Sequence, residues 1–286
     1  MKNVVDVMRK SIVVNTTLAI IKVFIGLLAK SGALIADGIH SFSDLVTDFV
    51  AIFGTYLSKK PADEKHPFGH GKIEYLTSIG ISLVIIFMGL FIIYESRNNE
   101  SLPSILVLSV SVFTIISKYV LSSYIIKKGY KYKNNILISS GYESRTDVIS
   151  SIVVLISSVL MLLSEKIEIL KYADVVAMII VGLFIIRTGY KLLVENISTI
   201  LGEKETDEEE INKVKNIINK VEDIKTIDSL LLIKYGTYYK LICEVGMDEN
   251  APLKDVHSHI ELLEKKLKSR DKRIKYVTIH VNPIKE

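Results

Sequence analysis

The chain has 286 residues, of which 49% are hydrophobic and 24% are charged, and its mean hydropathy is +0.35. A positive mean hydropathy with this many charges is unusual for a soluble globular protein. The single cysteine, Cys243, excludes a disulfide framework and a four-cysteine metal site. The formal net charge of +4 is too small to indicate a nucleic-acid partner.

Long apolar blocks fill the chain up to Ile200, and each has the roughly 20 residues that a helix needs to cross a bilayer. The six blocks are residues 10–30, 33–58, 73–96, 102–127, 136–164 and 172–200. The first block could instead be a signal peptide, because basic residues precede it, but it is longer than a typical signal core and five blocks follow. After Gly202 the chain becomes charge-rich, so we expect an all-α membrane domain of six helices at residues 1–202 and a soluble domain at 203–286.

Basic residues in the short loops predict the orientation, because such residues are retained on the cytoplasmic side. One side of the membrane would carry Lys2, Arg9, Lys10, Lys59, Lys60, Lys65, Lys72, Lys127, Lys128, Lys131 and Lys133, and the other only Lys30, Arg97, Lys166 and Lys171. Both termini are therefore predicted to be cytoplasmic. We expect a cell membrane, since an N-terminal organelle address rich in Arg and Ser is absent.

The second block contains the segment ADGIHSFSD, which places acids and a histidine inside the membrane. Asp37, His40, Asp44 and Asp48 follow one another at intervals of three, four and four residues, so a helix aligns them on one stripe. Intramembrane acids are costly and mark functional sites by default. The fifth block carries Glu143 and Asp147, which are also four residues apart.

The two groups are predicted to lie at the same depth. Asp44 lies about 11 residues from the outer end of its block, and Asp147 lies about 11 residues from the inner end of its own, which is about 16 Å in each case. In an apolar core about 30 Å thick, both are near the midplane. His40, Asp44, Glu143 and Asp147 are therefore predicted to converge, and one imidazole with three carboxylates suits a divalent transition metal.

Structural ion pairs are the alternative explanation for these acids. The basic residues that could neutralise them within the blocks are Lys22, Lys118, Arg145 and Arg187. Paired spacing on two helices is more than neutralisation requires, so we favour the metal site. Asp37 and Asp48 fit an interface or a gate as well as they fit a metal contact.

The first predicted cytoplasmic loop reads PADEKHPFGHGK from Pro61 to Lys72, and it follows ADGIHSFSD closely. With these two motifs, the six blocks, the fifth-block pair and the small C-terminal domain, essentially the full chain resembles the cation diffusion facilitators. The sequence GHGK alone does not predict a phosphate-binding loop, because it lacks the required spacing and the Ser or Thr.

The resemblance implies a homodimer in the lipid bilayer that is not an enzyme and that exchanges cytoplasmic divalent metal for external protons by alternating access. It implies a transport site of His40, Asp44, Glu143 and Asp147. It also implies that Asp63, His66 and His70 occupy loop positions that bind a second metal in some members.

Departures from the family pattern affect the transport site and the dimer hinge, and in the tail Asn282 replaces a usual acid. Members usually have His at the position of Glu143, and an oxygen ligand there favours Mn²⁺ or Fe²⁺ over Zn²⁺, whereas His40 acts in the opposite sense. Zn²⁺, Mn²⁺, Fe²⁺ and Co²⁺ therefore all stay candidate substrates. Gly202 stands where many members have an acid that pairs with the lysine of GHGK, so that pairing is not expected for Lys72 unless Glu203 replaces the acid.

Metal and protons are expected to compete for this site, because imidazole and carboxylate ligands bind metal only when deprotonated. Coupled to inward-facing and outward-facing states, such competition is sufficient for antiport. We expect His40 to be the proton carrier, since histidine is the side chain that titrates near neutral pH.

The tail after Gly202 is predicted to be an α+β domain. A helix is predicted with Thr206 as its N-cap, and two strands flank Gly236. An amphipathic helix covers LKDVHSHIELLEKKLKS, and IKYVTIHVNP alternates as a final strand. This order of helix, strand, strand, helix and strand is similar to the ferredoxin-like tail of the family.

By resemblance, regulatory metal between two tails of a dimer would be bound by Glu244, His259, His280 and Asn282. The alternative is that the tail histidines only face solvent. Cys243 is expected to point away from Glu244, since neighbouring residues of a strand face opposite sides. Zinc is expected to raise the melting temperature of the fragment 203–286 if the tail site exists.

Two other classes of protein could use a buried histidine and carboxylates of this kind. A membrane-embedded metalloenzyme would also use buried histidine and carboxylates, but the chain lacks the HExxH motif. A non-transporting metal sensor would use the same ligands as a transporter. A site at the membrane midplane favours passage of the ion over sensing.

Overall fold

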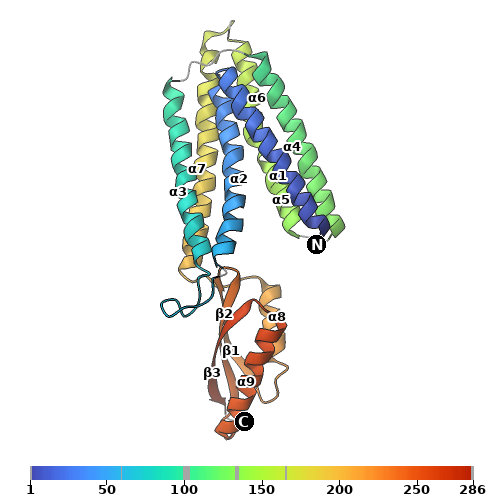
Figure 1. Ribbon diagram of the computed structural model, residues 1–286, viewed down its shortest axis with the longest axis vertical. Coiled ribbons are helices and arrows are strands. Elements are labelled where there is room, and N and C mark those ends of the chain that lie inside the picture. Colours follow the sequence, from blue (N-terminus) through green and yellow to red (C-terminus); the bar gives the residue numbers. More distant parts are fainter. Residues whose placement is uncertain (1, 59, 99–103, 133–134, 165, 285–286) are drawn as a thin grey trace. The chain divides into compact units, whose positions relative to one another are not determined.

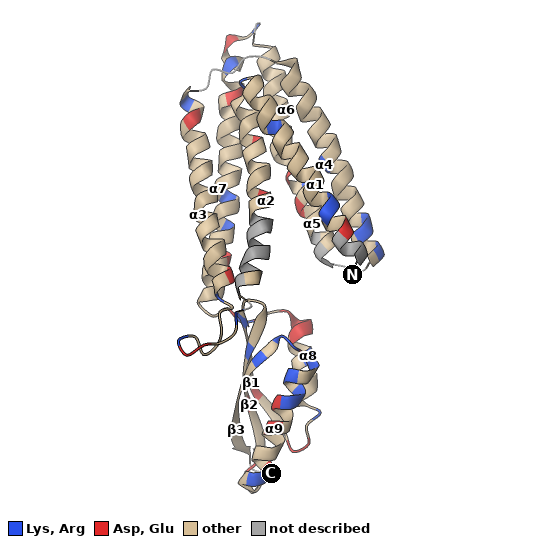
Figure 2. Cartoon of the chain, viewed as in Figure 1, with Lys and Arg blue, Asp and Glu red and all other residues tan. Residues whose placement is uncertain are grey.

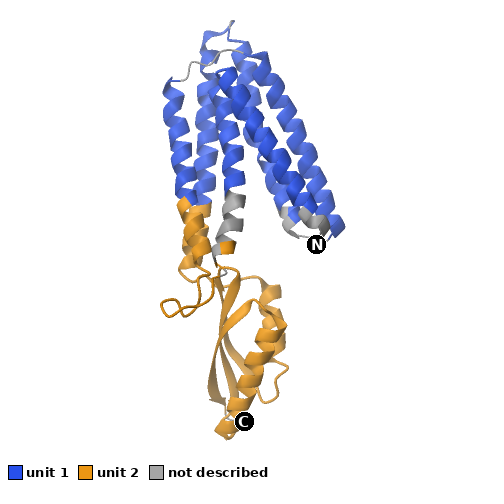
Figure 3. Cartoon of the chain, viewed as in Figure 1, with its two compact units in different colours: residues 1–49, 81–191 blue, residues 50–80, 192–286 orange. Residues whose placement is uncertain are grey.

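The computed structural model describes the whole chain except residues 1, 59, 99–103, 133–134, 165 and 285–286, and at residues 2–5, 47–55, 57, 135–136 and 139 it describes the backbone alone. The chain divides into two compact units. The first unit comprises residues 1–49 and 81–191, and the second comprises residues 50–80 and 192–286 (Figure 3).

Long helices make up the first unit, and those at residues 32–58, 73–95 and 173–200 continue into residues of the second (Figure 1). They are α1 (Lys2–Leu28), α2 (Gly32–Ser58), α3 (Ile73–Glu95), α4 (Ile105–Tyr132), α5 (Asn135–Thr146), α6 (Val148–Leu162) and α7 (Ala173–Ile200), with the 3₁₀ turns η1 (Ser96–Asn98) and η2 (Glu168–Tyr172). Helices suit a bilayer because each backbone polar group finds its partner within the same segment. Charged residues are sparse along these helices (Figure 2).

Five helical segments among the described residues are long and apolar enough to span a membrane. They are Asp6–Leu28, Ile73–Asn98, Ile105–Tyr132, Ser140–Leu162 and Glu168–Ile200. The remaining predicted block, 33–58, coincides with the 27-residue helix α2, which is not one of these five. The structure thus confirms a helical membrane domain, and the sixth span stays a prediction.

Glycines allow α3 and α7 to pack backbone against backbone. A Cβ atom on Gly89 would lie 2.9 Å from the carbonyl oxygen of Gly182, and a Cβ atom on Gly182 would lie 3.1 Å from the carbonyl oxygen of Gly89. Close packing of small residues is the main source of helix association in lipid, where apolar surface is not driven out of water.

The fifth predicted block, 136–164, forms two consecutive helices, α5 and α6, which meet at Asp147. The backbone of Asp147 keeps helical angles, φ −65° and ψ −19°, and its N–H still donates to the carbonyl of Glu143. The hydroxyl of Ser150 donates to the carbonyl of Asp147 at 2.8 Å. The interruption of the helix thus coincides with a predicted metal ligand.

The tail in the second unit has the predicted order of elements. They are α8 (Glu208–Ile218), β1 (Thr226–Tyr235), β2 (Tyr238–Asp248), α9 (Leu253–Arg270) and β3 (Ile274–Ile284). The sheet order is β1-β2-β3, with β1 antiparallel and β3 parallel to β2. Helix α8 is capped by Asp207, whose carboxylate accepts from the N–H of Glu209, so the predicted cap at Thr206 was wrong by one residue.

The core of the tail lies between the sheet and its two helices (Figure 1). Leu241, Cys243 and Val245 alternate along β2 and are fully buried against Leu263 and Leu267 of α9. This confirms that Cys243 points to the opposite face of the sheet from Glu244.

The described part of the tail has three strands, whereas a complete ferredoxin-like unit has the order βαββαβ. The position of a first strand, ahead of α8, is occupied by residues 203–205. They contribute a single bridge, from Lys204 to Ile233 of β1. The tail therefore has the ferredoxin-like order from its first helix onward.

Candidate metal centres

Three of the four predicted transport ligands lie together in the first unit. His40 and Asp44 occupy successive turns of α2, and Asp147 lies where α5 meets α6. One ligand atom from each of the three lies within 4.8 Å of the others. Because the three ligand atoms are this close together, one ion could contact all of them and so bridge α2 and the α5–α6 junction.

Two atoms of this group are buried without a hydrogen-bond partner among the described residues. They are Nδ1 of His40, a residue that is 6% exposed, and Oδ2 of Asp44. Buried polar atoms are almost always paired, so each such exception needs an explanation. A divalent cation would satisfy both atoms, because imidazole nitrogen and carboxylate oxygen are ordinary ligands of transition metals.

Glu143, the fourth predicted ligand, is not part of this group, and its side chain is exposed. It lies on α5 one turn before Asp147. The spacing of four residues thus predicts that Glu143 lies one turn from Asp147, but it does not predict whether the Glu143 carboxylate points toward the other three ligands.

Asp37 forms a buried ion pair and has a structural role in this arrangement. Its carboxylate lies 2.7 Å from Nζ of Lys22 and accepts from the hydroxyls of Ser150 and Ser151 at 2.7 and 2.8 Å. The alternative explanation by ion pairs therefore holds for Asp37. The side chain of Asp48 lies outside the described residues.

The serines that bind Asp37 were missed in the sequence. The signal that could have found them is the repeated Ser pair of the fifth block, Ser150–Ser151 and Ser157–Ser158, which puts hydroxyls on one face of α6 at spacings of seven residues.

The other basic residues that could neutralise the acids have different surroundings. Lys118 lies 3.4 Å from Asp147, Arg145 donates to the hydroxyl of Ser123, and Arg187 is exposed.

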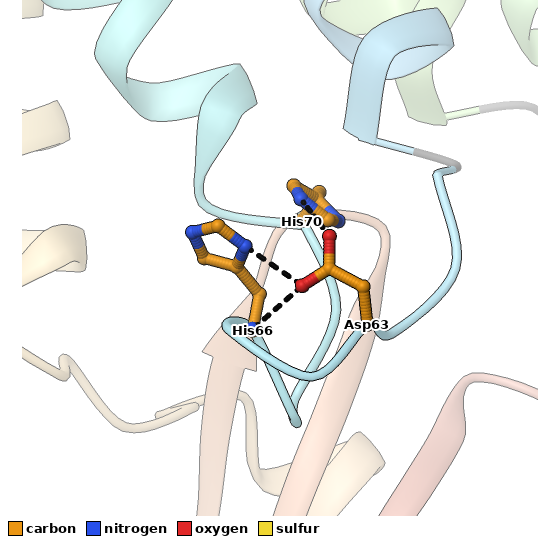
Figure 4. Close-up of side chains that lie close together, drawn as sticks. All are labelled: Asp63, His66 and His70. Carbon is orange, nitrogen blue, oxygen red and sulfur yellow. Dashed lines mark hydrogen bonds and ion pairs between the residues drawn. The ribbon is translucent and has the colours of Figure 1, made fainter.

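A second group of ligands lies in the loop before α3, within the second unit (Figure 4). Oδ1 of Asp63 accepts from the backbone N–H of His66 at 2.7 Å and lies 3.0 Å from Nδ1 of the same residue. Nε2 of His70 lies 3.4 Å from Oδ2 of Asp63. The hydrogen bond from the His66 backbone lowers the pKa of Asp63, which keeps the carboxylate ionised and available as a ligand.

The hydrogen bond of His70 fixes which of its nitrogens can bind metal. Its Nδ1 lies 3.0 Å from the carbonyl oxygen of Pro61, which can only accept, so Nδ1 carries the proton. Nε2 is then the nitrogen with a free electron pair, and it is the one beside Asp63. Fixing the tautomer in this way is typical of metal-binding histidines.

The same loop is anchored on the β1–β2 hairpin by the hydroxyl of Tyr238. This hydroxyl donates to the carbonyl of Phe68 at 2.6 Å and accepts from the N–H of Gly71 at 3.2 Å. A Cβ atom on Gly71 would lie 2.2 Å from the carbonyl oxygen of Tyr235, so the second glycine of GHGK is required by this contact.

Lys72, the lysine of GHGK, donates to the carbonyl of Ile200 at the end of α7, at 2.9 Å. A cation is favourable at this end of a helix, where the backbone carbonyls lack partners. The absence of an acid at Gly202 is thus accommodated by a backbone acceptor.

The four predicted tail ligands do not come together within one chain. Glu244 and His280 are direct neighbours across β2 and β3, on the sheet face away from the helices. Asn282 donates to Asp228 at 2.7 Å. His259 is on α9, which packs on the opposite face, and its Nε2 lies 3.4 Å from Asp223.

Comparison with known families agrees with these observations. Residues 8–201 match the cation efflux transmembrane domain, and residues 206–284 match the cytoplasmic domain of cation efflux proteins. The chain belongs to the cation efflux family, which confirms the resemblance to the cation diffusion facilitators. It is a multi-pass membrane transporter of divalent metal cations with a cytoplasmic C-terminal domain, and not an enzyme.

Several relatives are similar over nearly their whole length. The chain is 29% identical to the manganese efflux system protein MneP of Bacillus subtilis, over 96% of this chain and 94% of the relative. It is 31% identical to an uncharacterized transporter of Methanocaldococcus jannaschii, over 95% of each chain. A solved cadmium form of a MamM C-terminal domain overlaps with 27% of this chain and 98% of that one, at 14% identity and a TM-score of 0.27.

Proposed function

We propose that the chain exports Mn²⁺ from the cytoplasm in exchange for protons, as a homodimer that alternates between inward-facing and outward-facing states. The membrane domain would comprise residues 1–202 with six spans, and the tail residues 203–286. The protein would lie in a cell membrane, with both termini on the cytoplasmic side. The observation that carries the proposal is that Nδ1 of His40 and Oδ2 of Asp44 are buried beside Asp147 with no hydrogen-bond partner in the described part of the chain.

The ligand set supports manganese among the candidate ions. Mn²⁺ prefers oxygen ligands more than Zn²⁺ does, and two of the three gathered ligands are carboxylates. Glu143 would add a third carboxylate from α5, one turn before Asp147. The relatives MneP and MneS of Bacillus subtilis are both named for manganese efflux.

Proton coupling follows from the chemistry of these ligands. The imidazole of His40 and the carboxylates of Asp44 and Asp147 bind either a proton or the metal, so loading from the cytoplasm releases protons and protonation from outside releases metal. Alternating exposure of the site to the two sides turns this competition into exchange.

Two further sites are proposed as regulatory. Asp63, His66 and His70 would bind a second metal ion in the loop, where the side chains are already gathered. Glu244, His259, His280 and Asn282 would act between the tails of two chains. The parallel pairing of β2 with β3 keeps Glu244 beside His280, which supports these two residues as part of the tail site.

The test is metal flux in proteoliposomes with an imposed pH gradient. Native protein is compared with Asp44→Asn/Asp147→Asn, using Mn²⁺, Zn²⁺, Fe²⁺ and Co²⁺. The exposed Glu168→Gln is the control, since Glu168 lies at the protein surface, where it pairs with Lys171. We expect Mn²⁺ flux that follows the gradient, is retained in the control and is lost in the double variant. Metal-dependent changes of shape without flux would instead indicate the sensor.

A further inference from the structure

Lys118 is a buried cation beside the proposed transport site. It lies on α4, is 2% exposed, and its Nζ is 3.4 Å from Oδ2 of Asp147. A charged side chain at such depth in a membrane helix is costly and usually functional. Its carboxylate partner is one of the three gathered ligands, so the ammonium and a bound metal would compete for the same group.

We propose that Lys118 is a tethered counter-cation that holds Asp147 when the site is empty and that an incoming divalent ion must displace. This inference rests on the proposed function of the site. Its consequence is that Lys118 weakens metal binding, which keeps the ion exchangeable and sets the concentration at which export begins.

The charges around the site support this role. Asp44 and Asp147 both place carboxylates in the gathered group, and two such charges repel each other when no cation is present. The ammonium of Lys118 relieves that repulsion in the empty state. When a divalent ion binds between the carboxylates, Lys118 becomes a like charge close to it and opposes its binding.

Hydroxyl groups on α4 can receive the ammonium after it leaves Asp147. Thr114 and Ser122 lie one turn before and after Lys118 and are fully buried. Each donates its hydroxyl hydrogen to a backbone carbonyl, of Ser111 and Tyr119 respectively, so its oxygen still has electron pairs to accept from Nζ. Displacement therefore does not leave the charge without partners.

A second buried lysine, Lys22, forms an ion pair that is fixed by further hydrogen bonds. Nζ of Lys22 lies 2.7 Å from Asp37 and also donates to the hydroxyls of Ser41 and Ser151. The contact between Lys118 and Asp147 is longer, at 3.4 Å, and involves a carboxylate from the metal group. Lys22 is thus held in a network, whereas Lys118 is positioned to exchange.

The experiment measures the dissociation constant of Mn²⁺ for the full chain in lipid nanodiscs at one fixed pH. All proteins carry Asp63→Ala/His66→Ala/His70→Ala, so that the loop group does not contribute. Lys118→Met is compared with the unaltered lysine, with Lys118→Arg, and with Lys127→Met, an exposed lysine of the same helix. We expect Lys118→Met to bind Mn²⁺ at least tenfold more tightly, Lys118→Arg to stay as weak as the lysine form, and Lys127→Met to be unchanged.

A folded Lys118→Met protein with unchanged or weaker binding would overturn the inference, because damage to the fold weakens a site and does not tighten it. Folding is checked by gel filtration and melting temperature, and Lys118→Gln replaces the methionine variant if that variant fails to fold. Asp44→Asn/Asp147→Asn separates the two proposals. If this pair leaves Mn²⁺ binding intact, the proposed transport site fails. If it abolishes binding while neither neutral Lys118 variant tightens it, only the counter-cation fails.

Discussion

Nζ of Lys22 and Oδ2 of Asp37 form an ion pair of 2.7 Å in which the two side chains are 0% and 1% exposed. The pair links α1 to α2, and hydroxyls of Ser150 and Ser151 extend it to α6. Removing one member of such a pair leaves a buried charge without compensation, which is among the most destabilising changes a single substitution can make.

Lys22→Met is therefore expected to lower the free energy of unfolding by about 3–5 kcal/mol. Unfolding of the detergent-solubilised protein by heat or denaturant measures this loss. Lys10→Met is the matched control, because Lys10 forms an exposed pair with Asp6 at 2.9 Å on the same helix and should give no measurable shift. Equal melting temperatures for the two variants would show that the buried pair does not stabilise the bundle.

The hydroxyl of Tyr238 is expected to hold the metal-binding loop on the hairpin. Tyr238→Phe removes the partner of Phe68 and Gly71, at a cost of about 1 kcal/mol, so the loop should open about fivefold more often. Limited trypsin cleavage after the exposed Lys65 measures this opening.

Tyr239→Phe provides the control for that experiment. The Tyr239 hydroxyl donates to Glu205 at 2.9 Å, outside the loop, so cleavage at Lys65 should stay at the native rate. Equal acceleration in both variants would mean that general loosening of the tail, and not the loop contact, controls cleavage.

Burial raises the pKa of the Cys243 thiol from an ordinary value of 9.0 to about 11. The thiolate is the form that reacts with alkylating reagents, so Cys243 should be unreactive in the native protein at pH 8 and should react once the tail unfolds. The native form holds its proton more tightly, so this group's contribution to tail stability is complete below pH 9 and declines as the pH rises toward 11. Rapid labelling at pH 8 without unfolding would contradict the buried position.

Metal binding at the loop should be detectable without transport. Divalent metal is expected to slow trypsin cleavage after Lys65 in the native chain, because the ion would join Asp63, His66 and His70 into one folded loop. His66→Ala/His70→Ala should remove the protection, which is measured as the ratio of the cleavage rates with and without metal in the same variant. Protection that persists in this variant would place the metal elsewhere.

Regular spacing made part of the site predictable, and packing determined the rest. Intervals of three and four residues place His40 and Asp44 on one face of α2, and depth in the membrane predicts their meeting with Asp147. Lys22 is one of four basic residues that could neutralise the acids, but spacing could not assign it to Asp37 or reveal the serines, because the rotation of α1 and α6 against α2 decides which side chains face Asp37. The Lys22 ion pair is therefore a property of the assembled helices.

The tail shows the same division. Period-two alternation predicts that Cys243 and Glu244 face opposite sides of the sheet, and the structure confirms it. His259 lies on a helix, and only the packing of α9 through Leu263 and Leu267 shows that this helix covers the face opposite Glu244. A motif transferred by residue position does not contain that information.

The anchoring of the loop by Tyr238 makes the loop and the hairpin partners in a thermodynamic cycle. If metal on His66 and His70 strengthens the contact with the hairpin, then any event that holds the hairpin against the loop must raise the metal affinity by the same factor. A tail that dimerises, or that binds another molecule, would then adjust the sensitivity of a site formed entirely by another segment of the chain. Reading the loop's metal affinity would therefore report on the state of the tail.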